Sequence, residues 1–276
     1  MVGTANDTIP AVNGAAAALD GRARHDRVTV VIPAKDEARN VAWVLRRLPG
    51  WIDEVILVDG DSVDDTVAVA RAIRPDVVVV AERGPGKGAA LRTGLDLAHG
   101  DVIVTIDADG SMDPRELERY VDRARDLDLV KGSRFARSGG TDDISLLRRL
   151  GNAMLLLLVN VLYGTHLTDL CYGFCAVRRS ALPVLGLRSD GFEIETEMTV
   201  RALRAGLRVG EVPSFEAPRR YGVSHLRAFR DGWRVLITLL AVRVRPCRLP
   251  GMTAELAAAD GALTAVEAVP GGGRSL

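Results

Sequence analysis

Two carboxylates stand two residues apart where an apolar run of the sequence ends. The run 102–106 is followed by Asp107, Ala108 and Asp109, and then by a Gly-Ser pair. Because alternate residues of an extended strand point the same way, both acids can face one point in space. Carboxylate oxygens are ligands that hard divalent cations prefer in proteins. The spacing therefore predicts a site for Mg²⁺ or Mn²⁺, and the alternative is an ordinary strand that ends in a polar turn.

Polar or glycine-rich residues also follow three other apolar runs. The four segments are 33–37, 59–62, 84–88 and 107–109. The Gly86-Lys87 pair suits a phosphate, although its loop lacks the Walker pattern G-x-x-x-x-G-K-[ST]. The first run is not followed by G-x-G-x-x-G, which argues against a dinucleotide site. Each segment also has a plainer interpretation, as a helix cap or as a turn before a helix.

These segments need a scaffold that brings them together. Short runs rich in Val and Ile are typical of strands buried on both faces, and helical patterns alternate with them. The predicted strands are 28–32, 55–58, 77–81 and 102–106, and the predicted helices are 38–48, 64–73 and 89–98. This βαβαβ order implies an α/β fold with a mostly parallel sheet and right-handed crossovers. Open sheets of this kind bind ligands at the carboxyl ends of their strands, where all four polar segments would lie.

The composition bounds the class of protein. A chain of 276 residues with 47% hydrophobic content suits one α/β domain, perhaps with an appended helical part. Thirty-six basic and thirty-six acidic residues cancel, which argues against a nucleic-acid partner. Residues 201–250 nevertheless hold eleven arginines and three acids, a net charge of +8 that suits phosphates, an anionic membrane face or simply a solvated surface. Three sparse cysteines indicate a reducing cytoplasm.

The two ends and two apolar segments complete the domain prediction. Residues 1–27 are expected to be a flexible leader, 28–249 the catalytic domain and 250–276 a disordered tail. The apolar segments 154–163 and 235–244 are about ten residues each, which is too short to cross a bilayer. Arginines and a tryptophan flank the second segment, so it suits either a helix in the membrane interface or one packed on the sheet.

The chain resembles the family 2 glycosyltransferases of GT-A fold, and among them the dolichyl- or polyprenyl-phosphate sugar synthases. The resemblance covers roughly residues 28–240 and rests on seven motifs in family order. They are VIPAKDE at 31–37, VDGDSVDDT at 58–66, GKGAAL at 86–91, DADG at 107–110, GSRF at 132–135, DLCYGF at 169–174 and RYGVSH at 220–225. Two departures are Asp-Gly-Asp-Ser in the second loop, where Asp-Asp-Gly-Ser is common, and His225, where a lysine is common.

The resemblance implies roles for individual residues. Pro33, Ala34, Glu37, Asp59, Lys87, Asp107, Ala108 and Asp109 would bind the donor, with Asp59 on its base. Asp107 and Asp109 would hold the metal, and Ser111 or His225 would be an additional ligand. Arg134, Arg219, Arg220, Ser224 and His225 would neutralise phosphate in a loop that closes over the site.

The implied chemistry differs between two classes of acceptor, a lipid phosphate and a hydroxyl. A nucleoside diphosphate leaves as the anomeric carbon is attacked, so the growing negative charge needs a cation and arginines. A lipid phosphate needs no general base, whereas a hydroxyl needs one. Asp169 is then the first candidate and Glu195 the second, unless Asp169 only orients a loop and Glu193, Glu195 and Glu197 form the outer face of a helix.

The predicted function is metal-dependent, inverting transfer of a sugar from a GDP- or UDP-linked donor to a polyprenyl phosphate. We expect the enzyme in the cytoplasm, with peripheral contact to the inner face of the membrane. The first alternative is a soluble glycosyltransferase that acts on a hydroxyl of a small metabolite or natural product. The second is a nucleotidyltransferase, which also uses paired acids on an α/β sheet.

Overall fold

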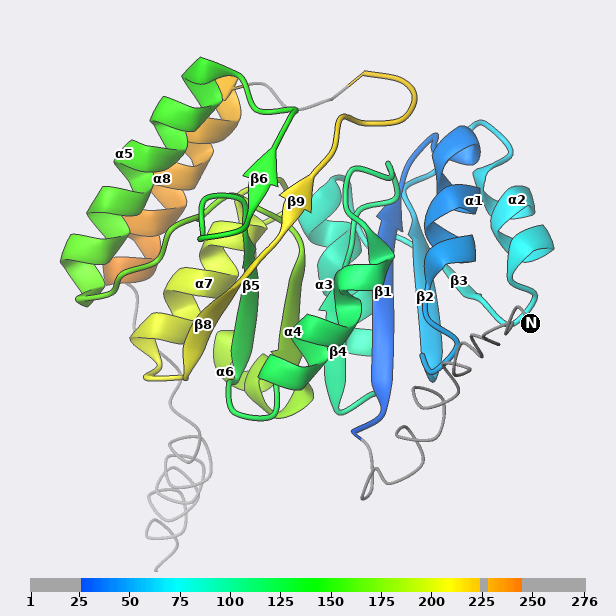
Figure 1. The fold of residues 1–276 in the computed structure, drawn as a ribbon, viewed down its shortest axis with the longest axis horizontal. Helices are drawn as coiled ribbons and strands as arrows, with labels where there is room; N and C mark the ends of the chain where they lie inside the picture. Colours follow the sequence, from blue (N-terminus) through cyan, green and yellow to red (C-terminus); the bar gives the residue numbers. More distant parts are fainter. Residues whose placement is uncertain (1–25, 224–227, 245–276) are drawn as a thin grey trace, which may run out of the picture.

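A computed structural model describes residues 26–223 and 228–244 of the chain. Seven strands form one sheet in the order β3-β2-β1-β4-β7-β5-β8 (Figure 1). They are β1 (Val28–Ala34), β2 (Glu54–Asp59), β3 (Val78–Ala81), β4 (Val102–Thr105), β5 (Leu129–Ser133), β7 (Cys175–Arg178) and β8 (Val209–Pro213). A second sheet pairs β6 (Gly140–Thr141) with β9 (Phe215–Glu216). The four predicted strands are all present.

The main sheet is mixed. Strand β1 runs parallel to β2 and β4, β2 runs parallel to β3, and β5 runs parallel to β8. Strand β7 is antiparallel to both of its neighbours, β4 and β5. The expectation of burial on both faces holds for β1, β2 and β4 and is wrong for β3, because β3 is an edge strand with two exposed residues.

Helices cover both faces of the sheet. The helices are α1 (Ala38–Arg47), α2 (Thr66–Ile73), α3 (Lys87–Leu97), α4 (Leu117–Arg123), α5 (Leu146–Tyr163), α6 (Leu182–Leu185), α7 (Ile194–Arg204) and α8 (Ala228–Val244). Side chains of α1, α2 and α4 pack in one buried cluster, and those of α3, α6 and α7 pack in another. Because side chains alternate along a strand, Val30 belongs to the first cluster and Val31 to the second.

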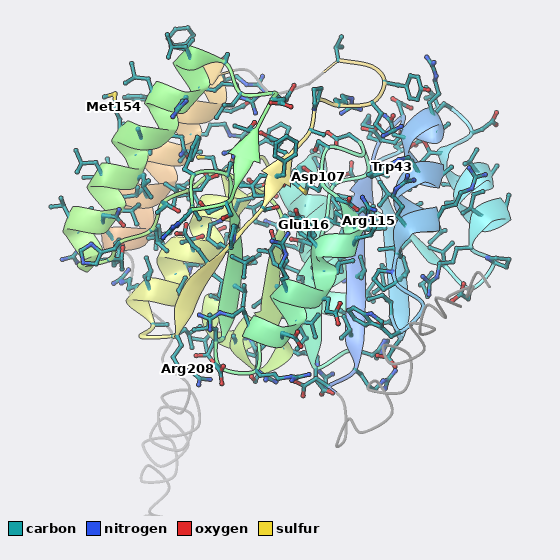
Figure 2. All side chains as sticks on the ribbon, in the orientation of Figure 1. Trp43, Asp107, Arg115, Glu116, Met154 and Arg208 are labelled. Carbon is teal, nitrogen blue, oxygen red and sulfur yellow. The ribbon has the colours of Figure 1, made fainter. Side chains whose placement is uncertain are left out.

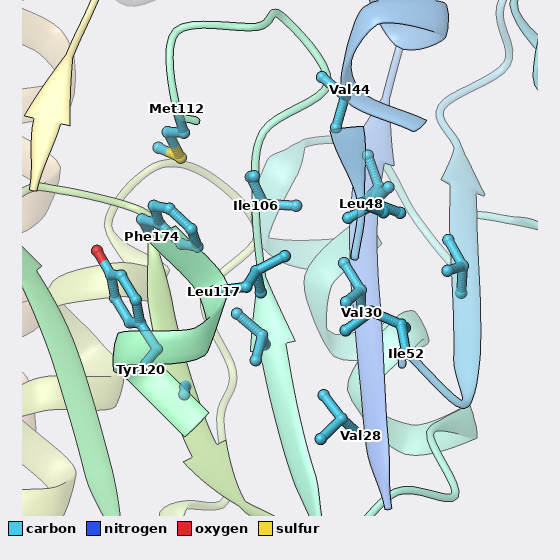
Figure 3. Packing of buried hydrophobic residues seen from close by; sticks show 14 of the residues in the cluster. Val28, Val30, Val44, Leu48, Ile52, Ile106, Met112, Leu117, Tyr120 and Phe174 are labelled. Atoms are coloured by element: carbon cyan, nitrogen blue, oxygen red, sulfur yellow. The ribbon is translucent and has the colours of Figure 1, made fainter. Parts of the chain in front are cut away.

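The first cluster fixes the loop that follows β4. Ile106 and Met112 are buried on either side of this loop and belong to the same cluster as Leu117 (Figure 3). Tyr120 stacks on Phe174 with ring centroids 4.2 Å apart. Aromatic pairs at this distance add attraction beyond the area that they bury. The carboxylates between Ile106 and Met112 therefore stand on a rigid, well-packed support.

Helices α5 and α8 lie side by side at one edge of the molecule (Figure 1). Together with α7 they enclose a third buried cluster, which includes Val159 and Leu239. Their remaining sides carry exposed apolar side chains three or four residues apart, the spacing of one helical face. These residues are Leu146, Leu147, Leu150, Met154, Leu157, Val161 and Leu162 of α5, and Phe229, Trp233, Ile237, Leu240 and Val244 of α8. We call this set the apolar face.

The expectation that the apolar segments are too short to cross a bilayer is wrong for the first one, because both segments are parts of longer helices. Helix α5 has 18 residues and α8 has 17, since each helix begins with a stretch, interrupted by arginines such as Arg148 and Arg230, that the apolar runs leave out. Within the described ranges, α5 is the one helix that is long and apolar enough to cross a membrane, judged by length and composition. Only 11% of it is buried, so it is not an ordinary core helix. The predicted leader, up to residue 25, and the predicted tail fall outside the described residues.

Candidate active site

A polar cavity of about 510 Å³ lies where β1, β2 and β4 end. Seven of the residues predicted to bind a donor line it: Pro33, Ala34, Glu37, Lys87, Asp107, Ala108 and Asp109. Figure 2 labels Asp107 and Trp43 of α1 near the upper ends of the strands. The expectation that loops at the carboxyl ends meet at one site is therefore confirmed for these residues.

The glycine-rich loop before α3 has a backbone that requires glycine. Gly84 and Gly86 have φ angles of 113° and 105°. A Cβ on Gly86 would also lie 2.4 Å from the carbonyl oxygen of Asp190, so the loop packs directly against that segment. Two backbone N–H groups at the start of α3 donate to this same carbonyl. The loop thereby fixes Lys87, the first residue of α3, at the wall of the cavity.

Lys87 bridges two acids inside the cavity. Its Nζ lies 2.7 Å from Asp107 Oδ1 and 2.6 Å from Glu195 Oε1. Burial opposes the charge of Lys87, but the two carboxylates outweigh it and raise the pKa of the amine. Burial, with repulsion from Asp109 and Glu195, raises the pKa of Asp107 to about 6 although Lys87 acts against it. Lys87 is thus a fixed ammonium, suited to hold negative charge and not to accept a proton.

Asp109 meets a second cation. Its Oδ2 lies 3.4 Å from Nη1 of Arg219, and its Oδ1 accepts a hydrogen bond from the backbone N–H of Ser111. The other end of the same guanidinium pairs with Glu37. Burial raises the pKa of Glu37, while Asn40 and Arg219 oppose that shift by bonding to its carboxylate. Both acids predicted to hold a metal are therefore paired with side-chain cations of the protein itself.

The loops after β1 and β2 are joined to each other. The backbone N–H of Asp36 donates to Ser62 Oγ, and the N–H of Val63 donates to Asp36 Oδ1 over 2.8 Å. Asp36 and Asp61 both adopt a positive φ, of 55° and 61°, a conformation that aspartate tolerates better than most residues. The altered order Asp-Gly-Asp-Ser of the second loop thus fits a specific turn, a point that spacing alone does not reveal.

Asp59 stands just behind the wall of the polar cavity. Its Oδ2 accepts a hydrogen bond from the N–H of Ser62, but its buried Oδ1 has no hydrogen-bond partner among the described residues. Its neighbour Gly60 lines the cavity, and Lys35 donates to the Gly60 carbonyl over 2.7 Å. A buried acceptor without a partner is costly, so Asp59 is suited to receive a donor group from a ligand.

Arg134 and Asp169, both predicted to be catalytic, form a buried ion pair. Arg134 Nε lies 2.7 Å from Asp169 Oδ2, and Nη2 donates to Asp169 Oδ1 over 3.0 Å. Arg134 Nη1 also lies 3.1 Å from Glu216 Oε2. The Arg134 and Asp169 side chains are 2% and 0% exposed, and Asp169 is absent from the described linings of both cavities. This geometry favours the alternative in which Asp169 orients its surroundings.

A second, apolar cavity of about 470 Å³ lies between α5, α8 and the start of α7. Leu147, Leu150, Met154, Phe229 and Trp233 of the apolar face are among its lining residues. Four residues line both cavities, namely Arg148, Cys171, Phe192 and Glu195. The polar and apolar cavities therefore adjoin at these four side chains, one of which is a guanidinium.

Some predicted residues are placed differently from the sequence expectation. Glu193, Glu195 and Glu197 do not form an exposed helix face: Glu193 and Glu197 are buried, and Glu195 lines both cavities. Arg220, predicted to neutralise phosphate, lies over the ring of Trp43, 4.6 Å from its centroid, and is absent from the described lining of the polar cavity. Ser224 and His225 lie outside the described residues.

The sequence prediction missed Arg148, Cys171 and Phe192. Arg148 precedes the apolar run of α5, and its place one turn into the helix was the available signal. It pairs weakly with Asp143, at 3.6 Å, and keeps 26% of its side chain exposed. Burial raises the pKa of Cys171 to about 11, so this cysteine is an unreactive thiol in the wall.

The acids fit a metal that arrives with a ligand. Among residues 26–223 and 228–244, no three Asp, Glu, His or Cys side chains are grouped to hold an ion. Asp107 and Asp109 do line one cavity together. Mg²⁺ commonly uses one or two carboxylates and completes its shell with substrate phosphates and water. The donor set therefore suits a divalent cation that is shared with a diphosphate.

The chain matches known proteins over most of this fold. The family model described as "Glycosyl transferase family 2" matches residues 29–186, more than half of the chain. The undecaprenyl-phosphate mannosyltransferase of Micrococcus luteus is 33% identical over 213 residues, which is 72% of this chain and 87% of the relative. Glycosyltransferase AglJ of Haloferax volcanii is 31% identical over 221 residues, or 78% of this chain and 71% of the relative.

A solved structure gives the same result for the fold. Glucosyl-3-phosphoglycerate synthase of Mycobacterium tuberculosis, in complex with Mn²⁺, UDP-glucose and phosphoglyceric acid, superposes with a TM-score of 0.63 at 26% identity. The match covers 81% of this chain and 82% of that one. The mixed sheet, the helices on both faces and the family match agree with the predicted GT-A-like α/β fold. The chain belongs to glycosyl transferase family 2 and is a glycosyltransferase.

Proposed function

We propose that this glycosyltransferase moves a sugar from a nucleotide-sugar to a polyprenyl phosphate, with inversion and with a divalent cation. One observation carries the proposal: a polar cavity lined by carboxylates adjoins an apolar cavity whose lining belongs partly to an exposed apolar face. A phosphate on an isoprenoid chain has the same two-part chemistry. The likeness to an undecaprenyl-phosphate mannosyltransferase supports this acceptor.

The donor binds in the polar cavity. The free Oδ1 of Asp59 would accept a hydrogen bond from an N–H of the base, a group that uracil and guanine both possess. Asp107 and Asp109 would hold a Mg²⁺ or Mn²⁺ ion, which when bound withdraws negative charge from the diphosphate. Lys87 would contribute a fixed positive charge beside them. The structural relative that contains Mn²⁺ and UDP-glucose supports this assignment.

The transfer itself needs no general base when the acceptor is a phosphate. An anionic phosphate oxygen attacks the anomeric carbon from the side opposite the leaving group. The bond from that carbon to the diphosphate oxygen breaks, and the nucleoside diphosphate leaves with the electron pair. The acceptor loses no proton in this step, which agrees with the burial of Asp169 against Arg134. Asp169 is therefore proposed as a positioning residue, not as a base.

The protein must offset the repulsion between two phosphates. Arg148 lines both cavities and is partly exposed, so it is placed to bind the acceptor phosphate at their junction. Arg134 is already paired with Asp169 and Glu216 at the wall of the apolar cavity. It therefore shapes that wall, and Arg148 takes the larger part in neutralising the acceptor.

The apolar face would rest in the membrane interface. Twelve large apolar side chains are exposed on α5 and α8, and Arg149, Arg230 and Arg243 are exposed on the same helices. Apolar residues flanked by arginines favour the interface of an anionic bilayer. Because α5 is packed against α7 and α8, we infer that it lies along the surface and does not cross it. Peripheral attachment to the cytoplasmic face of the membrane is therefore part of the proposal.

Vesicle binding tests this function with a matched control. An Ile237→Glu/Leu240→Glu variant replaces two exposed residues of the apolar face that are absent from the described linings of both cavities, and Val63→Glu replaces an apolar residue that is 92% exposed elsewhere. We expect the double variant to lose binding to anionic vesicles and transfer to long-chain polyprenyl phosphate, while it keeps transfer to a short, soluble analogue. Val63→Glu should keep all three. Full long-chain activity in the double variant would contradict the membrane role.

A hydroxyl acceptor is the second candidate function. The structural relative with phosphoglyceric acid bound favours it, because that acceptor is small and soluble. Glu195 would then be the base, since it lines both cavities and Asp169 does not. Loss of transfer to such an acceptor in Glu195→Gln, together with no transfer to any polyprenyl phosphate, would establish this alternative.

A further inference from the structure

The segment 217–222, which we call the strap, crosses the polar cavity and is held at several points. The N–H of Ala217 donates to the Ser111 carbonyl over 2.9 Å, and the N–H of Arg220 donates to the Asp109 carbonyl over 3.3 Å. Asn40 of α1 donates from Nδ2 to the Tyr221 carbonyl over 3.1 Å. The strap is thus fastened both to the loop that carries the acids and to α1.

Two aromatic contacts hold the outer side of the strap. The guanidinium of Arg39 lies 4.0 Å from the ring centroid of Tyr221, and that of Arg220 lies 4.6 Å from the ring centroid of Trp43. Contacts of this kind at partly exposed sites contribute about 0.5–1 kcal/mol each. Gly222 ends the strap with a φ of 82°, a conformation that permits a sharp change of direction. The strap is therefore held by several weak contacts, which can be exchanged individually.

Arg219 is the part of the strap that points at the acids. Its side chain is 17% exposed and pairs with both Glu37 and Asp109. Asp109 Oδ1 already accepts a hydrogen bond from the Ser111 N–H, so each of its oxygens has a partner. A cation that uses Asp109 as a ligand must therefore compete with Arg219.

The local charge has the same implication. Four carboxylates and two cations form two ion-paired triads here, Lys87 with Asp107 and Glu195, and Arg219 with Glu37 and Asp109. Their formal sum is −2, so the cluster keeps an excess of negative charge even with both internal cations in place. A divalent cation alone would neutralise that excess, and it would make the contact of Arg219 with Asp109 dispensable.

We propose that Arg219 is a tethered place-holder for the metal, occupying Asp109 in the substrate-free enzyme and leaving it when a divalent cation binds. The proposal rests on the metal role given to Asp107 and Asp109 under the proposed function. When Arg219 leaves Asp109, its guanidinium becomes free to bind the phosphates that arrive with the metal. The exchange keeps the acids paired before binding and supplies a mobile positive charge after it. Metal binding and strap position are thereby coupled.

Mn²⁺ binding without nucleotide tests the place-holder directly. In Arg219→Gln the competitor for Asp109 is removed, so Mn²⁺ should bind roughly tenfold more tightly than to the wild type, within the usual range of such couplings. Arg219→Lys keeps a tethered cation and should return the affinity to about the wild-type value. Arg220→Gln removes the neighbouring charge, which faces Trp43 and not the acids, and should leave the affinity unchanged.

The outcomes separate the two proposals. Equal or weaker Mn²⁺ binding in Arg219→Gln, or an equal gain in Arg220→Gln, would overturn the place-holder and leave the metal role intact. Absence of Mn²⁺ binding to the wild type and to Arg219→Gln, both with and without UDP, would overturn the metal role and the place-holder with it. Circular dichroism melts of all variants would exclude unfolding as the cause.

A second readout follows the strap itself. With Trp51→Phe and Trp233→Phe as background, Trp43 is the single tryptophan of the chain and lies under Arg220. Addition of Mg²⁺ with UDP should change its fluorescence, because displacement of Arg219 moves the adjoining Arg220. The same addition to an Asp109→Asn variant in this background should give no change. If saturating ligand leaves the emission unchanged in the single-tryptophan protein that keeps Asp109, the release of the strap would be contradicted.

Discussion

The two cavities of this glycosyltransferase are lined in opposite ways. In the polar cavity, charged side chains are paired with one another: Lys87 with Asp107, and Arg219 with Asp109. In the apolar cavity, large side chains remain exposed: Met154, which Figure 2 labels on α5, and Trp233 of α8. We therefore expect the first site to bind its ligand by exchanging ion pairs and the second to bind its ligand by covering apolar surface. Their ligands should therefore respond differently to mutation and to salt.

The largest effect should come from the acid at the centre of the polar cavity. Asp109→Asn removes a charge on which the metal depends, so we expect turnover to fall by at least about a hundredfold. Chelation of the wild type should have the same result. Asp76→Asn alters an exposed acid that pairs with Arg74 far from both cavities, and it should keep full activity. Normal turnover of folded Asp109→Asn in chelator would remove the metal from the mechanism.

The next effect concerns the boundary between the cavities. Arg134→Ala leaves Asp169 charged and fully buried without its partner, so the free energy of unfolding should fall by about 3–5 kcal/mol. Denaturant titration measures this loss. The exposed pair of Arg208 and Asp128 provides the comparison, since breaking a surface pair costs at most about 1 kcal/mol. A stable but inactive Arg134→Ala protein would instead assign Arg134 a direct catalytic role.

The junction of the cavities should show a smaller and more selective effect. Arg148→Ala should raise the KM for the acceptor by roughly tenfold, the loss of one charge-assisted contact, and leave donor affinity unchanged. Arg149→Ala is the matched control, because Arg149 is exposed on the same helix and is absent from the described linings of both cavities. Steady-state kinetics with the donor and a short, soluble acceptor varied in turn measures both values, so that membrane contact of Arg149 does not contribute. Equal effects of the two variants would exclude a specific acceptor contact.

The smallest effect should be seen at the membrane surface. Arg230 is exposed on α8, and a basic residue near an anionic bilayer contributes about 1 kcal/mol. Arg230→Gln should therefore weaken binding to anionic vesicles by about fivefold at low salt, and the difference should vanish in high salt because the charges are screened. Sedimentation with neutral vesicles supplies the baseline. A salt-independent loss would mean that Arg230 acts through packing.

The polar cavity could be predicted from sequence better than the apolar one. Lys87 begins α3, and Asp107 and Asp109 follow β4 within four residues, so strand and helix patterns place all three at one edge of the sheet. The apolar cavity depends on how α5 and α8 pack against each other, and no local sequence pattern predicts that packing. The apolar runs also underestimated the lengths of both helices, because Arg148 and Arg230 lie in the first turns of α5 and α8 and interrupt the apolar pattern there.

The ion pairs inside the site could likewise not be predicted from the sequence. Asp169 and Arg134 are 35 residues apart, and Arg219 and Glu37 are 182 residues apart, so only the fold brings each pair into contact. The motif around Asp169 suggested chemistry, whereas its burial and its bonds to Arg134 indicate positioning. The resemblance to the family supplied the candidate residues. The geometry then separated the candidates that are buried in ion pairs from those that line a cavity.

Product analysis with long-chain polyprenyl phosphate in anionic vesicles tests the central proposal most directly. The enzyme would be supplied with Mn²⁺ and a panel of UDP- and GDP-sugars, and the lipid fraction would be analysed by mass spectrometry. We predict a sugar joined to the lipid phosphate with inverted anomeric configuration, formed from one donor class and abolished by chelator. A lipid fraction that stays unmodified with every donor, while a soluble hydroxyl acceptor is glycosylated, would contradict it.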